Sequence, residues 1–236
     1  MKRSQFCGAA VLVVAMVLGA CASAAPRPTQ SAPQAVSQAA SQAAPLTSGD
    51  IAAMAKASRD SARYPYTEAD IHFMSGMIAH HAQAITMARL APKNDASPSV
   101  RTLCDRIINA QTDEIRLMQM WLRDRHQAVP EPNPAGMTMM MNGMQHMMLM
   151  PGMLSDEQMK ELAAAKGGEF DRLFLTGMIQ HHRGAITMVN ELLATYGAAQ
   201  DELVAKFSQD VQADQGTEIV RMQQMLATVV MQGHAP

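Results

Sequence analysis

The chain carries one segment twice, and this duplication limits the folds available to it. Residues 73–88 read FMSGMIAHHAQAITMA, and residues 174–189 read FLTGMIQHHRGAITMV. The two segments align without a gap. A second match follows each of them: Gln111, Glu114, Ile115 and Met118 correspond to Gln215, Glu218, Ile219 and Met222. The repeated unit is therefore longer than the histidine segment, and the fold must contain two copies of it.

Apolar residues recur at helical spacing in both copies. Thr67 and Asp70 resemble a capping box, and Ser97-Pro98 is typical of a helix start. The last helix of each copy follows its histidine segment after a short break. We expect helices over about residues 67–90, 98–125, 169–196 and 201–231, with a short helix after residue 155.

Each copy is thus a helical hairpin that cannot bury its apolar face alone. Pairing the two hairpins predicts an all-α, ferritin-like four-helix bundle with pseudo-two-fold symmetry. No segment shows the alternation typical of a strand. The predicted organisation is a signal peptide with lipobox (1–20), a disordered tether (21–63), the first hairpin (64–129), a methionine-rich connector (130–154), and a short helix with the second hairpin (155–236).

The N-terminus has the features of an export signal. Lys2-Arg3 precedes an apolar stretch over residues 9–18, which is too short for a comfortable membrane span. Leu18-Gly19-Ala20-Cys21 resembles a lipobox, so we expect Cys21 to carry lipid and to anchor the protein to a membrane. The alternative is an ordinary signal peptide cleaved near residues 22–24. In both cases the folded part works outside the cytoplasm.

The composition excludes some classes of function and structure. The formal net charge of -2 gives no indication of a nucleic-acid partner. Two of the three cysteines lie in the first 21 residues, so a disulfide framework is not expected, and Cys104 reads as a buried free thiol. Methionine is abundant, with 23 residues, while aromatic residues make up only 4% of the chain.

The histidine segments predict a metal site. Met77, His80 and His81 share one turn of a helix, and the second copy repeats the arrangement. Packing does not explain paired histidines beside a methionine in both copies, whereas imidazole and thioether together suit copper. The predicted ligands are His80, His81, His181, His182, Met77 and Met178, with Met74 as a secondary one.

A structural role is the alternative for these histidines. One histidine of each pair would then hydrogen-bond to Glu114 or Glu218, and the other would be solvated. Such carboxylates are also compatible with a metal, because they fix the tautomer of a ligating imidazole. We therefore predict Glu114 and Glu218 as supporting residues of the site.

The connector is the second candidate for metal binding. Residues 136–153 hold nine of the 23 methionines, and prolines and glycines argue against a long helix there. A hydrophobic loop packed on the bundle is the alternative. Thioethers suit Cu(I) and Ag(I), and the loose spacing predicts weak sites without fixed geometry. The secondary ligands are Met137, Met139, Met140, Met141, Met144, His146, Met147, Met148 and Met150.

The repeated Met-Ile-x-His-His-x-x-Ala-Ile-x-Met pattern, with Phe73 ahead of it, resembles the bacterial family called domain of unknown function 305. The resemblance covers roughly residues 66–126 and 153–231. It implies a ferritin-like helical bundle, export from the cytoplasm and, in some members, copper binding and copper resistance. It implies no established reaction.

These observations predict an exported protein that buffers, sequesters or delivers Cu(I) or Cu(II), with a copper-handling protein as a partner, and that is not an enzyme. One alternative is a metal-free structural or interaction lipoprotein. Another is a ferritin-like iron oxidase, which requires Glu-x-x-His motifs. No Glu in the chain has a His three residues later.

Overall fold

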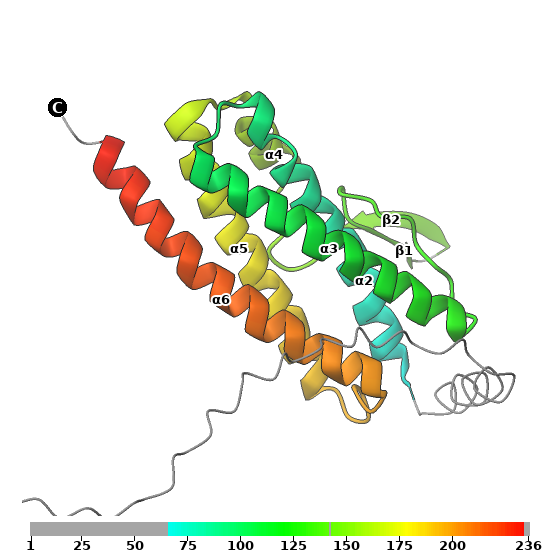
Figure 1. Ribbon diagram of the computed structural model, residues 1–236. Helices are drawn as coiled ribbons and strands as arrows, with labels where there is room; N and C mark the ends of the chain where they lie inside the picture. Colours follow the sequence, from blue (N-terminus) through cyan, green and yellow to red (C-terminus); the bar gives the residue numbers. More distant parts are fainter. Residues whose placement is uncertain (1–65, 142, 234–236) are drawn as a thin grey trace, which may run out of the picture. The chain divides into compact units, whose positions relative to one another are not determined.

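The computed structural model describes residues 66–141 and 143–233 (Figure 1). The predicted signal peptide (1–20), the predicted lipidation site Cys21 and the whole predicted tether (21–63) lie outside the described residues. No helix among the described residues is both long enough and apolar enough to cross a membrane.

The fold is mainly helical, as predicted. Four long helices, α2 (Glu68–Ala88), α3 (Pro98–Asp124), α5 (Gly167–Ala194) and α6 (Glu202–Gly233), are joined by the short elements η1 (Ala91–Lys93) and α4 (Asp156–Ala164). Helix α2 packs on α3, α5 packs on α6, and α2 also contacts α5 (Figure 1). The capping boxes at Thr67 and Ser155 are both formed, which confirms these two predicted helix starts.

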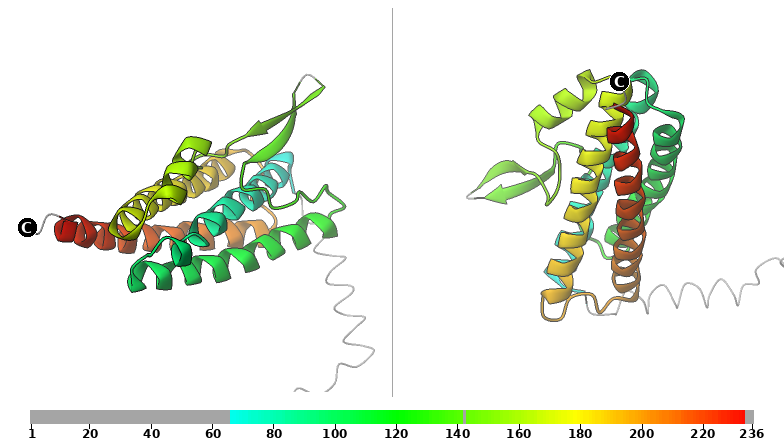
Figure 2. Two further views of the ribbon diagram at one scale, coloured as in Figure 1. Left: turned by 90° about the horizontal axis from the view of Figure 1, so that it is seen from above. Right: turned by 90° about the vertical axis from the view of Figure 1, so that its left-hand side faces the viewer.

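The prediction of an all-α chain is wrong in the connector. Strands β1 (Met137–Met141) and β2 (Met144–Met148) pair antiparallel as a hairpin that stands out from the helices (Figure 2). Methionine on both faces hides the alternation that reveals a strand. The missed signal is Asn142-Gly143, a dipeptide that favours tight hairpin turns. Gly143 has the positive φ, 78°, that such a turn requires.

The core divides into two apolar clusters. Met74 and Met77 belong to the first, around Phe73, and Met178 belongs to the second, around Phe174. Cys104 is a buried free thiol, as predicted, and burial raises its pKa to about 12. A thiol with so high a pKa stays protonated and is a poor metal ligand.

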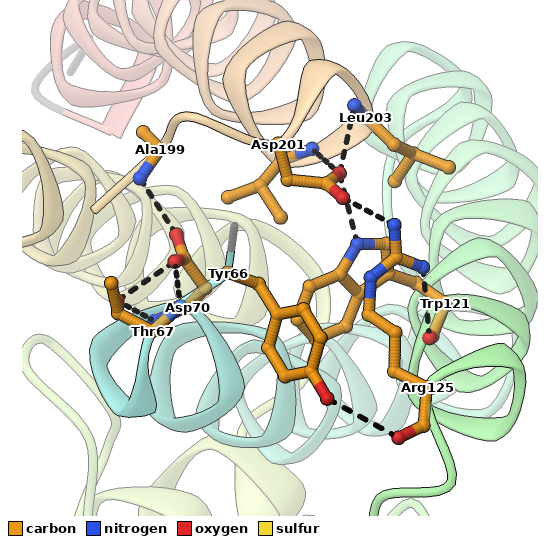
Figure 3. Close-up of polar contacts among 9 residues, drawn as sticks. Tyr66, Thr67, Asp70, Trp121, Arg125, Ala199, Asp201 and Leu203 are labelled. Carbon is orange, nitrogen blue, oxygen red and sulfur yellow. Dashed lines mark hydrogen bonds and ion pairs between the residues drawn. The ribbon is translucent and has the colours of Figure 1, made fainter. Parts of the chain in front are cut away.

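Two equivalent aspartates connect the repeats. Asp70 on α2 accepts a hydrogen bond from the backbone N of Ala199, in the loop before α6, at 2.7 Å (Figure 3). Asp171, at the same position of the second copy, accepts one from the backbone N of Ser97, before α3, at 3.2 Å. Both carboxylates are buried. Each copy therefore holds the interhelical loop of the other.

A buried polar network lies beside the first of these contacts. Arg125 forms an ion pair with Asp201, and the indole of Trp121 donates to the same carboxylate at 3.0 Å (Figure 3). The backbone N of Leu203 also donates to Asp201 at 3.0 Å, so this residue caps the start of α6. The end of α3 is thereby tied to the beginning of α6.

Candidate metal centre

The four histidines of the repeated segments come together in the middle of α2 and α5. All four side chains are fully buried. The rings of His80 and His181 face each other, with centroids 3.8 Å apart and planes at 38°. The geometry within each pair is the same: His80–His81 and His181–His182 both have centroids 6.3 Å apart and an interplanar angle of 53°. The centre therefore follows the two-fold symmetry of the repeat.

The outer histidine of each pair has a carboxylate partner, as predicted. The Nε2 of His81 lies 2.7 Å from Oε2 of Glu114, and the Nε2 of His182 lies 2.7 Å from Oε2 of Glu218. A carboxylate accepts the proton of an N–H, so each ring carries that proton on Nε2. A neutral imidazole protonated on Nε2 has its free lone pair on Nδ1.

The inner histidine of the first copy has a partner that was not predicted. The Nε2 of His80 lies 3.0 Å from the backbone O of Pro151 in the connector. A carbonyl only accepts, so this nitrogen donates. Burial, and then the proximity of His81, lower the pKa of His80 to about 3, and the carbonyl of Pro151 offsets only part of the effect. His80 is therefore neutral and has its lone pair on Nδ1.

The inner histidine of the second copy has no such partner. Burial, and then the proximity of His80, lower the pKa of His181 well below its ordinary value, with a small opposing contribution from the backbone of His80. Neither of its ring nitrogens makes a hydrogen bond of good geometry. Nδ1 is buried and unpartnered in all four rings: His80, His81, His181 and His182. Buried polar atoms without partners are costly in a folded protein, so these four Nδ1 atoms point to a ligand.

The rings do not yet surround a single point. Within the described part of the chain, no group of three or more His, Cys, Asp or Glu side chains is arranged to hold a metal ion. Met77 and Met178 are fully buried, but they lie in different apolar clusters. The structure brings the histidines together and leaves these methionines, with Met74, in the core on either side. The donor set present is a group of four buried imidazoles, which fits copper in either oxidation state.

A cavity leads from solvent to the carboxylate side of the centre. It has a volume of about 240 Å³ and lies between α3 and α6, where Gln111, Glu114, Gln215 and Glu218 line it. The two glutamines are equivalent in the repeat, and the Oε1 atom of each is buried without a partner. Oxygen donors therefore line this approach to His81 and His182.

The connector brings thioethers to the other side. In the β-hairpin, Met137 pairs with Met148, and Met139 pairs with His146. Side chains alternate along a strand, so these four residues share one face of the hairpin. Of the remaining predicted ligands, Met140, Met144 and Met147 are exposed and Met141 pairs with Met144. The prediction that these residues lack fixed geometry is wrong, because the hairpin register orders them.

Beyond the hairpin the connector is packed on the helices. Met150 is only 6% exposed and belongs to the core. Gly184 of α5 permits this path, since a Cβ on it would lie 1.9 Å from the backbone O of Pro151. Sequence reasoning missed both Pro151 and Gly184. The available signal was a difference between the copies, where Gly184 takes the place of Gln83.

The repeat, the buried histidine pairs and their carboxylates can be compared with known proteins. The family model described as domain of unknown function (DUF305) matches residues 70–226. The chain belongs to this family. No curated protein matches the DUF305 chain significantly.

Solved structures of two DUF305 relatives resemble the chain. A candidate secreted protein of Streptomyces coelicolor is 27% identical, with a TM-score of 0.56 over 68% of this chain and 93% of the other. CopM in its Cu(II)-bound form is 29% identical, with a TM-score of 0.52 over 67% of this chain and 96% of CopM. The Cu(I)-bound form of CopM gives 27% identity and a TM-score of 0.51, over 70% and 98%. A silver-soaked form gives 27% and 0.50, over 67% and 95%.

Proposed function

We propose that this DUF305 protein binds copper at the buried histidine pairs and buffers or delivers it outside the cytoplasm. The observation that carries the proposal is the set of four buried Nδ1 atoms without partners, on rings of which three, His80, His81 and His182, are oriented through a contact at Nε2. Supported, neutral imidazoles of this kind are metal ligands in many proteins. Copper binding by CopM is consistent with the proposal.

The ligands we propose are His80, His81, His181 and His182, with Met77 and Met178 favouring the reduced ion and Met74 in a supporting role. Small rotations of the rings would be needed to direct several lone pairs at one ion. We infer that the four long helices form a ferritin-like four-helix bundle that keeps the two pairs adjacent. The packing of α2 with α3, of α5 with α6 and of α2 with α5 supports this inference.

We further propose a secondary role for the hairpin and a lipid anchor for the chain. The shared face of Met137, Met139, His146 and Met148 would hold Cu(I) or Ag(I) weakly, and a copper-handling protein would receive the ion. Cys21 would carry the lipid. Replacing Cys21 with Ser should move the protein from the membrane fraction to the soluble fraction. Continued sedimentation of this variant with membranes would contradict lipid anchoring.

Copper titration of two matched variants tests the main proposal. Replacing His80, His81, His181 and His182 with Ala should abolish the rise in melting temperature that copper produces. The control replaces the other four histidines, His72, His126, His146 and His234, and should retain that rise. A ligand at 100 times its Kd stabilises the folded state by about 2.7 kcal/mol, so the difference is measurable.

A spectroscopic measurement on the unaltered protein complements the variants. Cu(II) bound to ¹⁵N-histidine-labelled protein should show hyperfine coupling to imidazole nitrogen in electron paramagnetic resonance. Iron retained by the purified protein would favour an oxidase. If the protein retains no metal, and copper changes neither the melting temperature nor the hyperfine coupling, a structural role is favoured. Equal stabilisation of the two quadruple variants would place the ligands elsewhere.

A further inference from the structure

Three methionine side chains converge over one glycine of α2. A Cβ placed on Gly76 would lie 2.9 Å from Sδ of Met150, 3.4 Å from Cε of Met188 and 3.7 Å from Sδ of Met137. These residues come from the connector, from α5 and from β1, respectively. Because all three thioether groups approach the same point, they are neighbours of one another.

The equivalent position of the second copy is filled differently. A Cβ on Gly177 would meet Cδ2 of Leu154 at 3.1 Å and Cε of Met87 at 3.3 Å. Leucine and one methionine therefore suffice to pack against a glycine in this fold. Packing alone does not explain why three thioethers are gathered at Gly76.

The cluster has access to solvent on one side. A cavity of about 110 Å³ between α2 and α5 is lined by Met150 and Met188, together with His72 and Glu191. Met137 is half-buried and belongs to the exposed hairpin. An ion can therefore approach the cluster either through this cavity or along the hairpin face that carries His146.

The other side of the cluster leads to the buried histidines. Met150 is followed by Pro151, whose carbonyl accepts the hydrogen bond from Nε2 of His80. Any movement of Met150 that follows metal binding is transmitted through one peptide unit to this acceptor. The cluster thus lies between the hairpin and the histidine pairs.

We propose that Met137, Met150 and Met188 form a trithioether site for a monovalent soft cation, Cu(I) or Ag(I). Thioethers are soft, neutral donors that need no deprotonation to bind. Transfer of the ion consists of exchanging one sulfur for another donor, with no change in oxidation state. This site rests on the proposed function in one respect only, which is that the histidine pairs would receive the ion.

Silver titration followed by NMR tests the site directly. The probe is Ag(I) in chloride-free buffer, added to the full chain with methionine labelled at the ¹³C ε-methyl group. Cys7 and Cys21 are replaced with Ser in every sample, so that neither thiol competes for silver. The ε-methyl signals of Met137, Met150 and Met188, assigned from single Met-to-Leu variants, should shift with the first equivalent of silver. The signals of the other hairpin methionines should shift only at higher silver concentration.

Two pairs of variants provide matched controls. Gly76→Ala should displace Met150 and lower the silver affinity roughly tenfold or more, a scale typical of disturbed metal sites. Gly177→Ala makes the same change at the equivalent position and should leave the affinity unchanged. Met188→Leu should also lower the affinity, whereas Met87→Leu, its equivalent in the first copy, should not. Gly76→Ala adds a helix-favouring residue against the flexible end of a side chain, so the fold should persist.

The outcomes separate this site from the proposed function. Unchanged silver affinity in Gly76→Ala and Met188→Leu would overturn the trithioether site, as would an equal loss in Met87→Leu. The variant lacking His80, His81, His181 and His182 should retain the three early methyl shifts. Those shifts, combined with copper stabilisation that does not depend on the four histidines, would leave the trithioether site standing and contradict the histidine proposal.

Discussion

The ring of His80 lies against the ring of His181, with 3.8 Å between the centroids. These side chains come from equivalent positions of α2 and α5, and burial keeps both neutral at physiological pH. The contact brings the histidine pairs of the two copies side by side. Burial of these two rings also makes the stability of the metal-free protein sensitive to acid.

The free energy of unfolding should decrease as the pH falls from about 6.5 towards 3. The unfolded chain takes up protons near the reference pKa of about 6.5, whereas the pKa of His80 in the folded state is about 3. Stability is therefore complete above the unfolded pKa and is lost below it, at up to about 1.4 kcal/mol per pH unit for His80. His181 acts in the same direction. Urea unfolding of metal-free protein at several pH values measures how steeply the free energy of unfolding changes with pH.

A pair of variants tests whether His80 causes this pH dependence of the free energy of unfolding. His80→Gln should reduce it, while His146→Gln should not, because His146 is exposed on β2. An identical slope in the parent and in His80→Gln would show that another group is responsible for the acid sensitivity.

Glu114→Gln and Glu218→Gln should weaken copper binding to the same extent. Each carboxylate holds the Nε2 proton of its histidine at 2.7 Å, and both contacts have the same geometry. Loss of such a supporting residue lowers metal affinity by roughly 10–100-fold. Calorimetric titration with copper measures the change, and Glu161→Gln on the exposed side of α4 is the control. A clear difference between the two variants would mean that the copies are not equivalent in binding.

Replacing Asp201 with Ala should be among the most destabilising changes in the chain. The substitution leaves the buried guanidinium of Arg125 without its partner and removes the acceptor of Trp121. Breaking a buried ion pair from one side costs about 3–5 kcal/mol. Asp113→Ala, which breaks an exposed pair with Arg116, should cost no more than about 1 kcal/mol. Chemical denaturation of the two variants tests the contrast, and similar losses would count against the network.

Gly184→Ala should displace the connector and lower stability. The new Cβ would meet the backbone O of Pro151 at 1.9 Å, and no side-chain rotation relieves a contact with backbone. We expect a loss of about 1–3 kcal/mol, typical of overpacking. Gly168→Ala, where a Cβ meets nothing within 4 Å, is the control. Because His80 donates to Pro151, the signal of its ring should also change in NMR spectra. An undisturbed ring signal would show that the connector tolerates the Cβ.

Local sequence patterns predicted most of the helices and the histidine–carboxylate contacts of the candidate metal centre. Capping residues and apolar spacing located the helices, and the repeated His-His together with Glu114 and Glu218 located the histidine–carboxylate contacts. These features repeat, so each copy supported the interpretation of the other. The four-helix bundle itself remains an inference from helix packing.

The unpredicted features arise where the copies differ or where distant segments meet. The contact between His80 and Pro151 joins residues 71 positions apart, and no local pattern encodes it. The β-hairpin was not predicted, because methionine occupies positions on both of its faces. The cluster over Gly76 was not predicted, because a methionine at helical spacing such as Met188 is usually core filling.

The reciprocal contacts of Asp70 and Asp171 bear on the origin of the chain. Each carboxylate binds a loop amide of the opposite copy, so a single hairpin would have both a carboxylate and a loop without partners. Two separate hairpins could satisfy both by associating about a two-fold axis, in the manner of an isologous interface. The internal repeat therefore has the architecture of a symmetric homodimer whose subunits have been fused into one polypeptide. In such a fusion the connector is the segment free to differ, and in this chain it holds nine of the 23 methionines.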